Sequence, residues 1–310
     1  MASSSSSSAM STVFLFVLFL SLTTTPLSSH AALVQQQPLV LRYHHGPLLK
    51  GNVSLSLLWY GRFSPSQRSV IVDFLHSLSP HHPPLPSPSA SSWWQTTDKY
   101  SSSARPSVTS LVVSSQLLRP NYPLGKSLKN YHLRALAGRP ASRSPGSISI
   151  VLTSEDVLVE GFCSRCGSHW SSGPKGGPVF IWVGNSAMQC PGQCAWPFHQ
   201  PIYGPQVPPL VAPNGDVGID GMIINLATLL AGTTTNPFGN GYFQGPVTAP
   251  LEAVTACAGA FGSGAYPGYP GKVLVDSTTG GGYNAYGVNG RKFLLPAMWN
   301  PQTSACKTLV

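Results

Sequence analysis

The spacing of apolar residues predicts an amphipathic helix over positions 64–78. The apolar positions recur as one helical face requires, at Val70, Ile71, Phe74, Leu75 and Leu78. Ser64 is a suitable N-cap, and Pro65 fits the first turn, where its missing N–H leaves no hydrogen bond unmade. We therefore expect a surface helix that buries one face.

Short apolar runs predict the strands of a central sheet. They cover positions 53–60, 108–113, 148–153 and 179–183, and their β-branched content fits strands better than helices. A loose alternation of strands and helices is typical of an α/β layer arrangement. The sequence thus predicts an α/β fold with a central mixed sheet and flanking helices.

A second helix is predicted over positions 220–231 and is apolar on nearly every side. Asp220 can cap its start, and Gly232 can close it in a left-handed conformation. We expect this helix to be buried all round, and at about 18 Å it is too short to span a membrane. Asn225 and Thr228 would then be polar groups in a core and would need partners.

Glycine and proline shape the rest of the chain. The 310 residues include 31 glycines and 30 prolines, and only 9% of the residues are charged. Many turns and long irregular loops follow from this composition. Positions 80–92 and 139–146 are predicted to be such loops.

The first 31 residues have the anatomy of a signal peptide. They contain no Asp, Glu, Lys or Arg, and the apolar run at 13–22 is followed by small residues. A run of about ten residues is too short to cross a bilayer of roughly 30 Å, and an ordinary buried helix here would lack caps and a polar face. We therefore expect residues 1–31 to be removed and residues 32–310 to form one secreted, extracellular domain.

Export gives weight to one glycosylation sequon, which begins at Asn52. A sequon specifies only two positions and is weak evidence by itself. We expect a glycan on Asn52, at the entrance to the predicted strand 53–60.

Six cysteines in an exported chain predict disulfide bonds. Cys257 and Cys306 are a natural pair, and the other four bridge among themselves, either locally or across two loops. These four are Cys163, Cys166, Cys190 and Cys194. The alternative is a zinc cluster that adds His169 and His199, but thiolates pair off in an oxidising compartment, so we expect no metal.

Lysine and arginine outnumber aspartate and glutamate by 18 to 9, which gives a formal net charge of +9. Outside a cell this charge favours acidic polysaccharides or membrane surfaces, although a basic surface also serves solubility. The basic residues are scattered singly and no nucleic-acid motif occurs, so we expect no nucleic-acid partner.

The chain contains no established catalytic or cofactor-binding motif, and no cofactor is expected. A glycosidase would need two carboxylates in one cleft, and the candidates set among aromatic-bearing loops are Asp216, Asp220 and Glu252. Each also has a structural explanation. Asp216 lies in a turn, Asp220 can cap a helix, and Glu252 can pair with Arg or Lys.

Aromatic residues are frequent in the Gly/Pro-rich loops of the second half. They are Trp196, Phe198, Tyr203, Tyr242, Phe243, Tyr266, Tyr269, Tyr283 and Tyr286. Aromatic rings can stack on the apolar faces of sugars, so these residues are candidates for glycan binding. Loop packing is the commoner explanation.

Several segments resemble the plant EXORDIUM family, also called the phosphate-induced protein family, and in particular its EXORDIUM-like branch. The resemblance lies in positions 33–53, in IWVGNS at 181–186, in CPGQCAWPFH at 190–199, in GIDGMIINLATLLAG at 218–232 and in GRKFLLPAMWNP at 290–301. It implies an apoplastic protein linked to brassinosteroid-responsive growth and cell expansion. It implies no established catalytic residues.

A further resemblance concerns positions 228–237, which are similar to an HELxExxTDP stretch of distant relatives with a zincin-like helix. Aligned on the closing TNP, Thr228 replaces the histidine, Leu229 the glutamate and Gly232 the second glutamate. These side chains cannot bind zinc or activate its water. The resemblance therefore implies a degenerate zincin-like scaffold.

Together these features predict a non-enzymatic secreted protein that promotes growth by binding a wall polysaccharide or a receptor ectodomain. The alternative is a wall-acting hydrolase with an unrecognised carboxylate site. The two differ in whether Asp216, Asp220 and Glu252 face one another or hold separate structural positions.

Overall fold

The computed structural model describes residues 38–101, 107–138, 146–173, 176–202, 204 and 207–310. Leu39–Val310 form one compact unit. The predicted signal peptide at 1–31 and positions 139–145 of one predicted loop lie outside the described residues.

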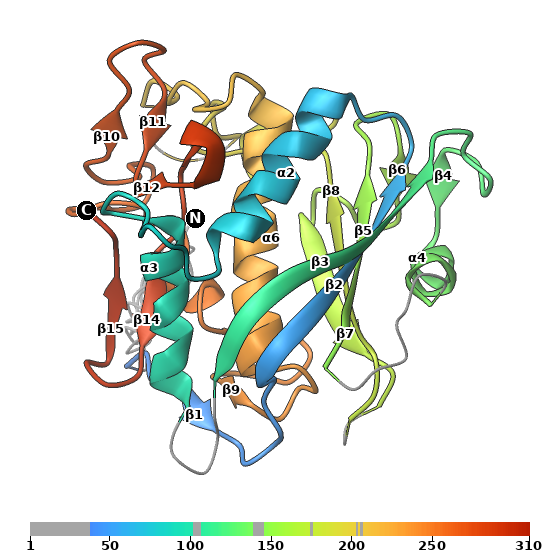
Figure 1. The fold of residues 1–310 in the computed structure, drawn as a ribbon, viewed down its shortest axis with the longest axis horizontal. Coiled ribbons are helices and arrows are strands. Elements are labelled where there is room, and N and C mark those ends of the chain that lie inside the picture. The colour runs from blue at the N-terminus through green and yellow to red at the C-terminus, as the bar shows by residue number, and fades with distance from the viewer. Residues whose placement is uncertain (1–37, 102–106, 139–145, 174–175, 203, 205–206) are drawn as a thin grey trace, which may run out of the picture. The chain divides into compact units, whose positions relative to one another are not determined.

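A mixed sheet of five strands forms the centre of this unit (Figure 1). The strands are β2 (Gly51–Tyr60), β3 (Val108–Arg119), β5 (Ile148–Thr153), β7 (Gly167–Ser171) and β8 (Val179–Gly184). Their order is β3-β2-β5-β8-β7, and only the edge strand β7 runs antiparallel to its neighbour. The predicted mixed sheet is confirmed. β3 extends beyond its predicted end, and β7, with the sequence GSHWS, has no apolar run that would predict it.

Helices pack on both faces of the sheet. They are α2 (Pro65–Ser77), α3 (Ala90–Trp94), α4 (Asn130–Ala137), α5 (Pro191–Cys194) and α6 (Val217–Thr235), with short 3-10 turns at η1 (Gln95–Tyr100), η2 (Thr255–Cys257) and η3 (Val288–Gly290). Figure 1 shows α2 crossing α6. The side chains of α2 and α6 share one core cluster, and those of α4 belong to another.

The remaining strands are short antiparallel or parallel pairs in the connecting segments. They are β1 (Arg42–Tyr43) with β9 (Tyr242–Phe243), β4 (Ser127–Leu128) with β6 (Leu158–Val159), β10 (Leu274–Val275) with β11 (Gly282–Tyr283), β12 (Ala285–Tyr286) with β13 (Lys292–Phe293), and β14 (Met298–Asn300) with β15 (Ala305–Lys307). The second half of the described chain is thus mostly loop, as its glycine and proline content predicts.

Strand β2 divides its side chains between two cores because successive residues of a strand point to opposite faces. Leu55, Leu57 and Trp59 join the cluster formed with α2 and α6. Leu58 and Tyr60 join the cluster formed with α4. All are almost fully buried, so the sheet is covered on both sides along this strand.

The predicted helix at 64–78 is confirmed as α2. The Ser64 hydroxyl accepts the Gln67 N–H at 3.1 Å, and the Gln67 side chain accepts the Ser64 N–H at 2.9 Å, which completes a capping box. Ile71 and Phe74 are fully buried on the inner face. Packing and capping therefore support the same helix that the apolar spacing predicts.

Helix α6 is longer than predicted at both ends, and both predicted end signals are wrong. Asp216, rather than Asp220, is the N-cap, and the helix continues through Gly232 to Thr235. Gly232 has no positive φ, so it does not close the helix in a left-handed conformation. α6 meets the length and hydropathy criterion for a membrane span, and 78% of that window is buried against the rest of the unit.

The predicted loop at 80–92 ends earlier than expected, because α3 begins at Ala90. Ser89 caps α3, and the hydroxyls of Ser89 and Ser92 complete a capping box. Trp93 is buried, and its indole N–H donates to the Pro296 carbonyl at 2.7 Å. A partner more than 200 residues away fixes this helix, so local sequence does not reveal it.

The predicted disulfide framework is confirmed, with no free cysteine. Cys257 pairs with Cys306 as expected. The other four pair across two loops rather than within them, as Cys163–Cys190 and Cys166–Cys194. Because all these sulfurs are in disulfide bonds, the alternative zinc cluster is wrong.

We expect loss of the Cys257–Cys306 bond to destabilise the fold strongly. It closes a segment with a sequence separation of 49 residues, and the loop-entropy relation gives about 4 kcal/mol for a loop of this size. In the Cys257→Ser/Cys306→Ser variant, urea denaturation should show a free energy of unfolding lower by about this amount. A change below about 1 kcal/mol would contradict the role of this bond as a tether.

Candidate functional site

Asp216 is used for helix capping and for joining two helices. One carboxylate oxygen accepts the Ile219 N–H at 3.0 Å, and the other accepts the Gln67 side-chain N–H at 2.9 Å. The first bond caps α6 and the second joins it to the first turn of α2. Both oxygens of Asp216 are therefore occupied by structural hydrogen bonds.

Asp220 lies in the first turn of α6 and is almost completely buried. Its oxygens accept the Asn214 backbone N–H at 2.9 Å and the Asn214 side-chain N–H at 2.7 Å. Burial raises the pKa of this carboxyl to about 7, although the two bonds from Asn214 oppose the shift. Asp220 thus anchors the loop that leads into α6.

Glu252 forms a buried polar network at the opposite end of α6. Its carboxylate oxygens lie 2.9 and 3.0 Å from Nε2 of His169, and one of them accepts the Asn236 side-chain N–H at 2.7 Å. The predicted Arg or Lys partner is wrong, because the partner is a histidine from β7. The Glu252 carboxylate occupies space that any side chain at Gly232 would need, since a Cβ there would lie 2.5 Å from it.

The three candidate carboxylates do not form one cleft. Asp216 and Asp220 lie at the N-terminal end of α6 and bond different partners, whereas Glu252 bonds Asn236 at the C-terminal end. A glycosidase needs two carboxyl groups facing each other across the scissile bond. Asp216 and Asp220 interact electrostatically one helical turn apart, but structural hydrogen bonds occupy the oxygens of both.

The zincin-like positions hold side chains with structural contacts. The Thr228 hydroxyl donates to the Ile224 carbonyl at 2.8 Å. Leu229 packs against β7 at Gly167, so closely that a Cβ added to Gly167 would lie 2.6 Å from the Leu229 Cδ1. Asn225 donates to the Cys194 carbonyl at 2.8 Å. In the part of the chain that the structure describes, no group of three His, Cys, Asp or Glu side chains could hold a metal.

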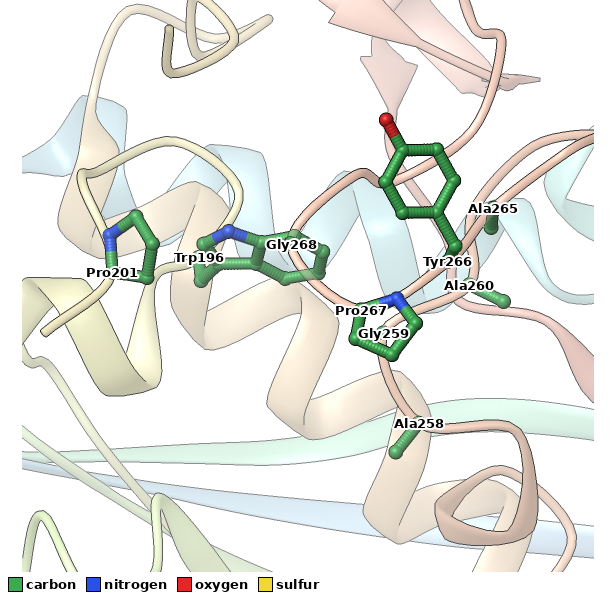
Figure 2. Close-up of a pocket in the computed structure, with 9 residues that line it drawn as sticks. All are labelled: Trp196, Pro201, Ala258, Gly259, Ala260, Ala265, Tyr266, Pro267 and Gly268. Carbon is green, nitrogen blue, oxygen red and sulfur yellow. The ribbon is translucent and has the colours of Figure 1, made fainter. Parts of the chain in front are cut away.

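A pocket lined by aromatic and small residues lies at the loops that follow α5 and η2, and we call it the aromatic pocket. It measures about 430 Å³ and is lined by Trp196, Pro201, Ala258, Gly259, Ala260, Ala265, Tyr266, Pro267 and Gly268. Figure 2 shows the rings of Trp196 and Tyr266 on two different loops, with Pro267 near Tyr266. The pocket therefore combines ring faces with small residues that leave room for a ligand.

Separate contacts hold the two rings. Trp196 follows α5, whose Cys194 is tied to Cys166, and its ring packs against Phe261 at 5.7 Å between centroids. Tyr266 is 59% exposed and sits on a tight turn in which its backbone exchanges hydrogen bonds with Tyr269. The Trp196 ring thus packs against Phe261, and the largely exposed Tyr266 ring packs against the Tyr269 ring with 5.1 Å between centroids.

Glycine allows the close approach of the loops. Gly259 has φ +77, a left-handed value that favours glycine, and its backbone faces the Trp196 ring. Gly268, with φ +90, occupies the turn after Tyr266. The glycines of this segment therefore shape the pocket.

Most of the other predicted aromatics have packing roles. Phe198 is buried in a small core, Tyr242 and Phe243 stack on Tyr43 and His44, and the hydroxyls of Tyr283 and Tyr286 lie 2.9 Å apart. Tyr203 lies outside the described residues. Of the predicted aromatics that the structure describes, only Trp196 and Tyr266 line the aromatic pocket.

We expect Asp220 to make stability depend on pH. The pKa of Asp220 is about 7 in the folded protein and 3.8 as a free side chain. The contribution of its protonated form to the free energy of unfolding is therefore complete below pH 4 and is lost as pH rises towards 7. Through this window the free energy of unfolding should fall by up to about 1.4 kcal/mol per pH unit. Urea denaturation of wild type and Asp220→Asn from pH 4 to 7.5 checks this, and equal slopes would contradict it.

We expect Glu252 to be structural. Glu252→Ala leaves the buried Asn236 amide and the His169 Nε2 without an acceptor, which should lower the free energy of unfolding by about 2 to 4 kcal/mol. The control Glu155→Ala removes an exposed carboxylate and should change it by less than about 0.5 kcal/mol. The double variant His169→Ala/Glu252→Ala should lose less than the sum of the single variants. Additive losses would show that the pair is not coupled.

Comparison with known proteins identifies the family. The phosphate-induced protein 1 conserved region matches residues 41–309. Protein EXORDIUM-like 2 of Arabidopsis thaliana is 62% identical over 310 residues, covering 97% of this chain and 100% of that protein. Protein EXORDIUM of the same plant is 55% identical, covering 96% and 99%. Protein PHOSPHATE-INDUCED 1 of Nicotiana tabacum is 56% identical, covering 90% and 91%.

No solved structure gives a significant match to the chain. The sequence matches nevertheless extend over nearly the whole of the described unit, including the loops of the aromatic pocket. The chain therefore belongs to the phosphate-induced protein 1 family, which includes the EXORDIUM proteins.

Proposed function

We propose that this protein is secreted, acts in the plant apoplast to promote brassinosteroid-responsive growth and cell expansion, and does so by binding a wall glycan without cleaving it. The growth role follows from what its family resemblance implies. The observation that carries the glycan-binding proposal is the pairing of Trp196 and Tyr266 in one pocket.

The export part of the proposal rests on the cysteines and the N-terminal sequence. All six cysteines form disulfide bonds, which persist in oxidising compartments and are rare in the cytosol. The uncharged, apolar N-terminal segment has the pattern of a cleaved signal peptide. An extracellular protein of a plant meets wall polysaccharides as its most abundant neighbours.

The shape of the aromatic pocket suits a sugar. Its volume of about 430 Å³ lies within the usual range for small-ligand sites. The apolar face of a pyranose can stack on an indole or phenol ring, and the Tyr266 hydroxyl can bond a sugar hydroxyl. Glycine and alanine on the remaining walls leave the ring faces uncovered.

The absence of cleavage in the proposal rests on how the carboxylates are used. Asp216, Asp220 and Glu252 each accept hydrogen bonds that hold α6 in place. None of them lines the aromatic pocket. For the alternative, a wall-acting hydrolase, the Glu252–His169 pair is the candidate, but its carboxylate is buried and also bonds Asn236.

The degenerate zincin-like scaffold is part of the same proposal. Asn225, Thr228 and Leu229 are the only partly exposed positions between Gly218 and Pro237 in the described chain. Leu229 lies against Gly167 of the edge strand β7, and Asn225 bonds the Cys194 carbonyl of α5. His169 and Glu252 lie beside Gly232 on this side. A former active-site cleft at this place would explain why polar side chains remain next to a core helix.

We expect Trp196→Ala and Tyr266→Ala each to weaken binding to wall glycans about tenfold, because each removes a stacking ring worth about 1.4 kcal/mol. The control is Tyr131→Ala, which removes a ring that is 65% exposed on α4, away from the pocket. Binding is measured by calorimetry against soluble neutral wall oligosaccharides, including xyloglucan and xylan fragments. Thermal unfolding of each variant verifies that it is folded.

Two results would overturn this proposal. One is wild-type protein that binds none of these oligosaccharides but captures a receptor ectodomain. The other is release of reducing ends from any of them by wild-type protein at a rate that Glu252→Gln abolishes. The first would place recognition on a protein partner, and the second would establish the hydrolase.

A further inference from the structure

A second pocket lies between α4 and the edge strand β7, and we call it the arginine pocket. It measures about 300 Å³. Its lining comes from α4 and from the β7 side, and consists of Asn130, Leu133, Arg134, Arg165, Ser168, His169 and Trp170. It shares no lining residue with the aromatic pocket. Its two guanidinium groups make it a polar, positively charged site.

Arg165 is held in place by its neighbours. It lies between Cys163 and Cys166, which are both tied to the segment after β8 by disulfide bonds. Its Nη2 donates to the Asn130 side-chain oxygen at 2.6 Å and approaches the Glu160 carbonyl at 3.4 Å. These contacts use one nitrogen of the guanidinium and leave other donors for a ligand.

Among the described residues, no carboxylate neutralises either arginine of the pocket. No ion pair in this part of the chain involves Arg134 or Arg165. The nearby Glu160 uses one carboxylate oxygen to accept both the backbone and the side-chain N–H of Asn130 at 3.0 Å, which orients that amide towards Arg165. The positive charge of the pocket is therefore available to an anion.

Strand alternation places an aromatic ring on the same side. Residues two apart in a strand share a face, so Ser168 and Trp170 face α4. His169 directs its Nε2 to Glu252 on the α6 side and also contributes to the lining of the arginine pocket. Trp170 is partly buried against Phe180, with ring centroids 5.6 Å apart. The pocket therefore combines an indole ring, two guanidinium groups, a hydroxyl and an amide.

This combination fits one chemical class of ligand. Guanidinium groups bind carboxylates through paired, charge-assisted hydrogen bonds, and the indole ring offers an apolar surface for a pyranose. Ser168 and Asn130 can bond ring hydroxyls. We propose that the arginine pocket is a subsite for a uronic acid residue of an acidic polysaccharide.

This inference rests on the proposed glycan-binding function and names the class of glycan. The net charge of +9 would concentrate such polyanions at the surface of the protein. General attraction of this kind does not distinguish one anion from another. The arginine pocket supplies the selectivity, because it pairs charge with a ring and hydroxyl partners.

The test compares two soluble probes with the same backbone, an oligogalacturonide and its fully methyl-esterified form, by calorimetry at about 0.15 M salt, where surface charges are screened. We expect wild type to bind the acidic form at least about tenfold more tightly. Arg134→Gln/Arg165→Gln should remove this preference and leave binding of the neutral xyloglucan fragments unchanged. Arg134→Gln alone, which breaks no ion pair among the described residues, should remove most of it even if the double variant unfolds.

The matched control is Arg42→Gln/Arg119→Gln, which removes the same charge from β1 and from the opposite edge strand β3. It should retain the preference for the acidic form. An equal loss in this control would overturn the inference, because the effect would then be general attraction. Equal affinity of wild type for the acidic and esterified probes, or tighter binding of dextran sulfate, would overturn it as well.

These results separate the two proposals. If neutral fragments bind through Trp196 and Tyr266 but the acidic preference is absent, the uronic acid subsite is wrong and glycan binding stands. If the acidic preference depends on Arg134 while Trp196→Ala and Tyr266→Ala change nothing, the subsite stands and the aromatic pocket is not the glycan site.

Discussion

The burial of α6 is the constraint on which the rest of the structure depends. A helix that is apolar on nearly all sides must be surrounded, and its ends and neighbours then need polar partners away from water. Asp216 and Asp220 provide them at one end, and Asn236, Glu252 and His169 at the other. The sheet, α2 and the long loops of the second half all pack around this helix.

This constraint explains why three of the chain's few carboxylates are structural. The chain has only nine Asp and Glu residues, and three of them are committed to positioning α6 or its adjoining loops. In the proposed function, ligand recognition falls to the loops, which disulfide bonds hold in place next to the helix. The aromatic pocket and the arginine pocket both adjoin the Cys166–Cys194 bond, since Trp196 lies two residues after one of its cysteines and Arg165 one residue before the other.

The sequence predicts what depends on local pattern and misses what depends on distant contacts. The apolar spacing of α2 and the β-branched runs of β5 and β8 predict those elements well, because burial and propensity agree there. The predicted end of α6 is wrong because Gly232, which usually signals the end of a helix, lies inside it. A side chain at this position would collide with the Glu252 carboxylate. His169 is not identified as a partner of Glu252 because 83 residues separate them. The sequence does not reveal that Trp196 and Tyr266 meet in one pocket, because these residues are also far apart along the chain.

We propose that this protein binds glycans on its loops and leaves them uncleaved at its core helix. A crystal structure of the protein with a wall oligosaccharide tests it most directly. We expect an intact oligosaccharide with a sugar ring against Trp196 or Tyr266, and an unchanged Glu252–His169 contact. A sugar seated beneath β7 against Thr228 and Leu229, with its glycosidic oxygen at Glu252, would contradict it.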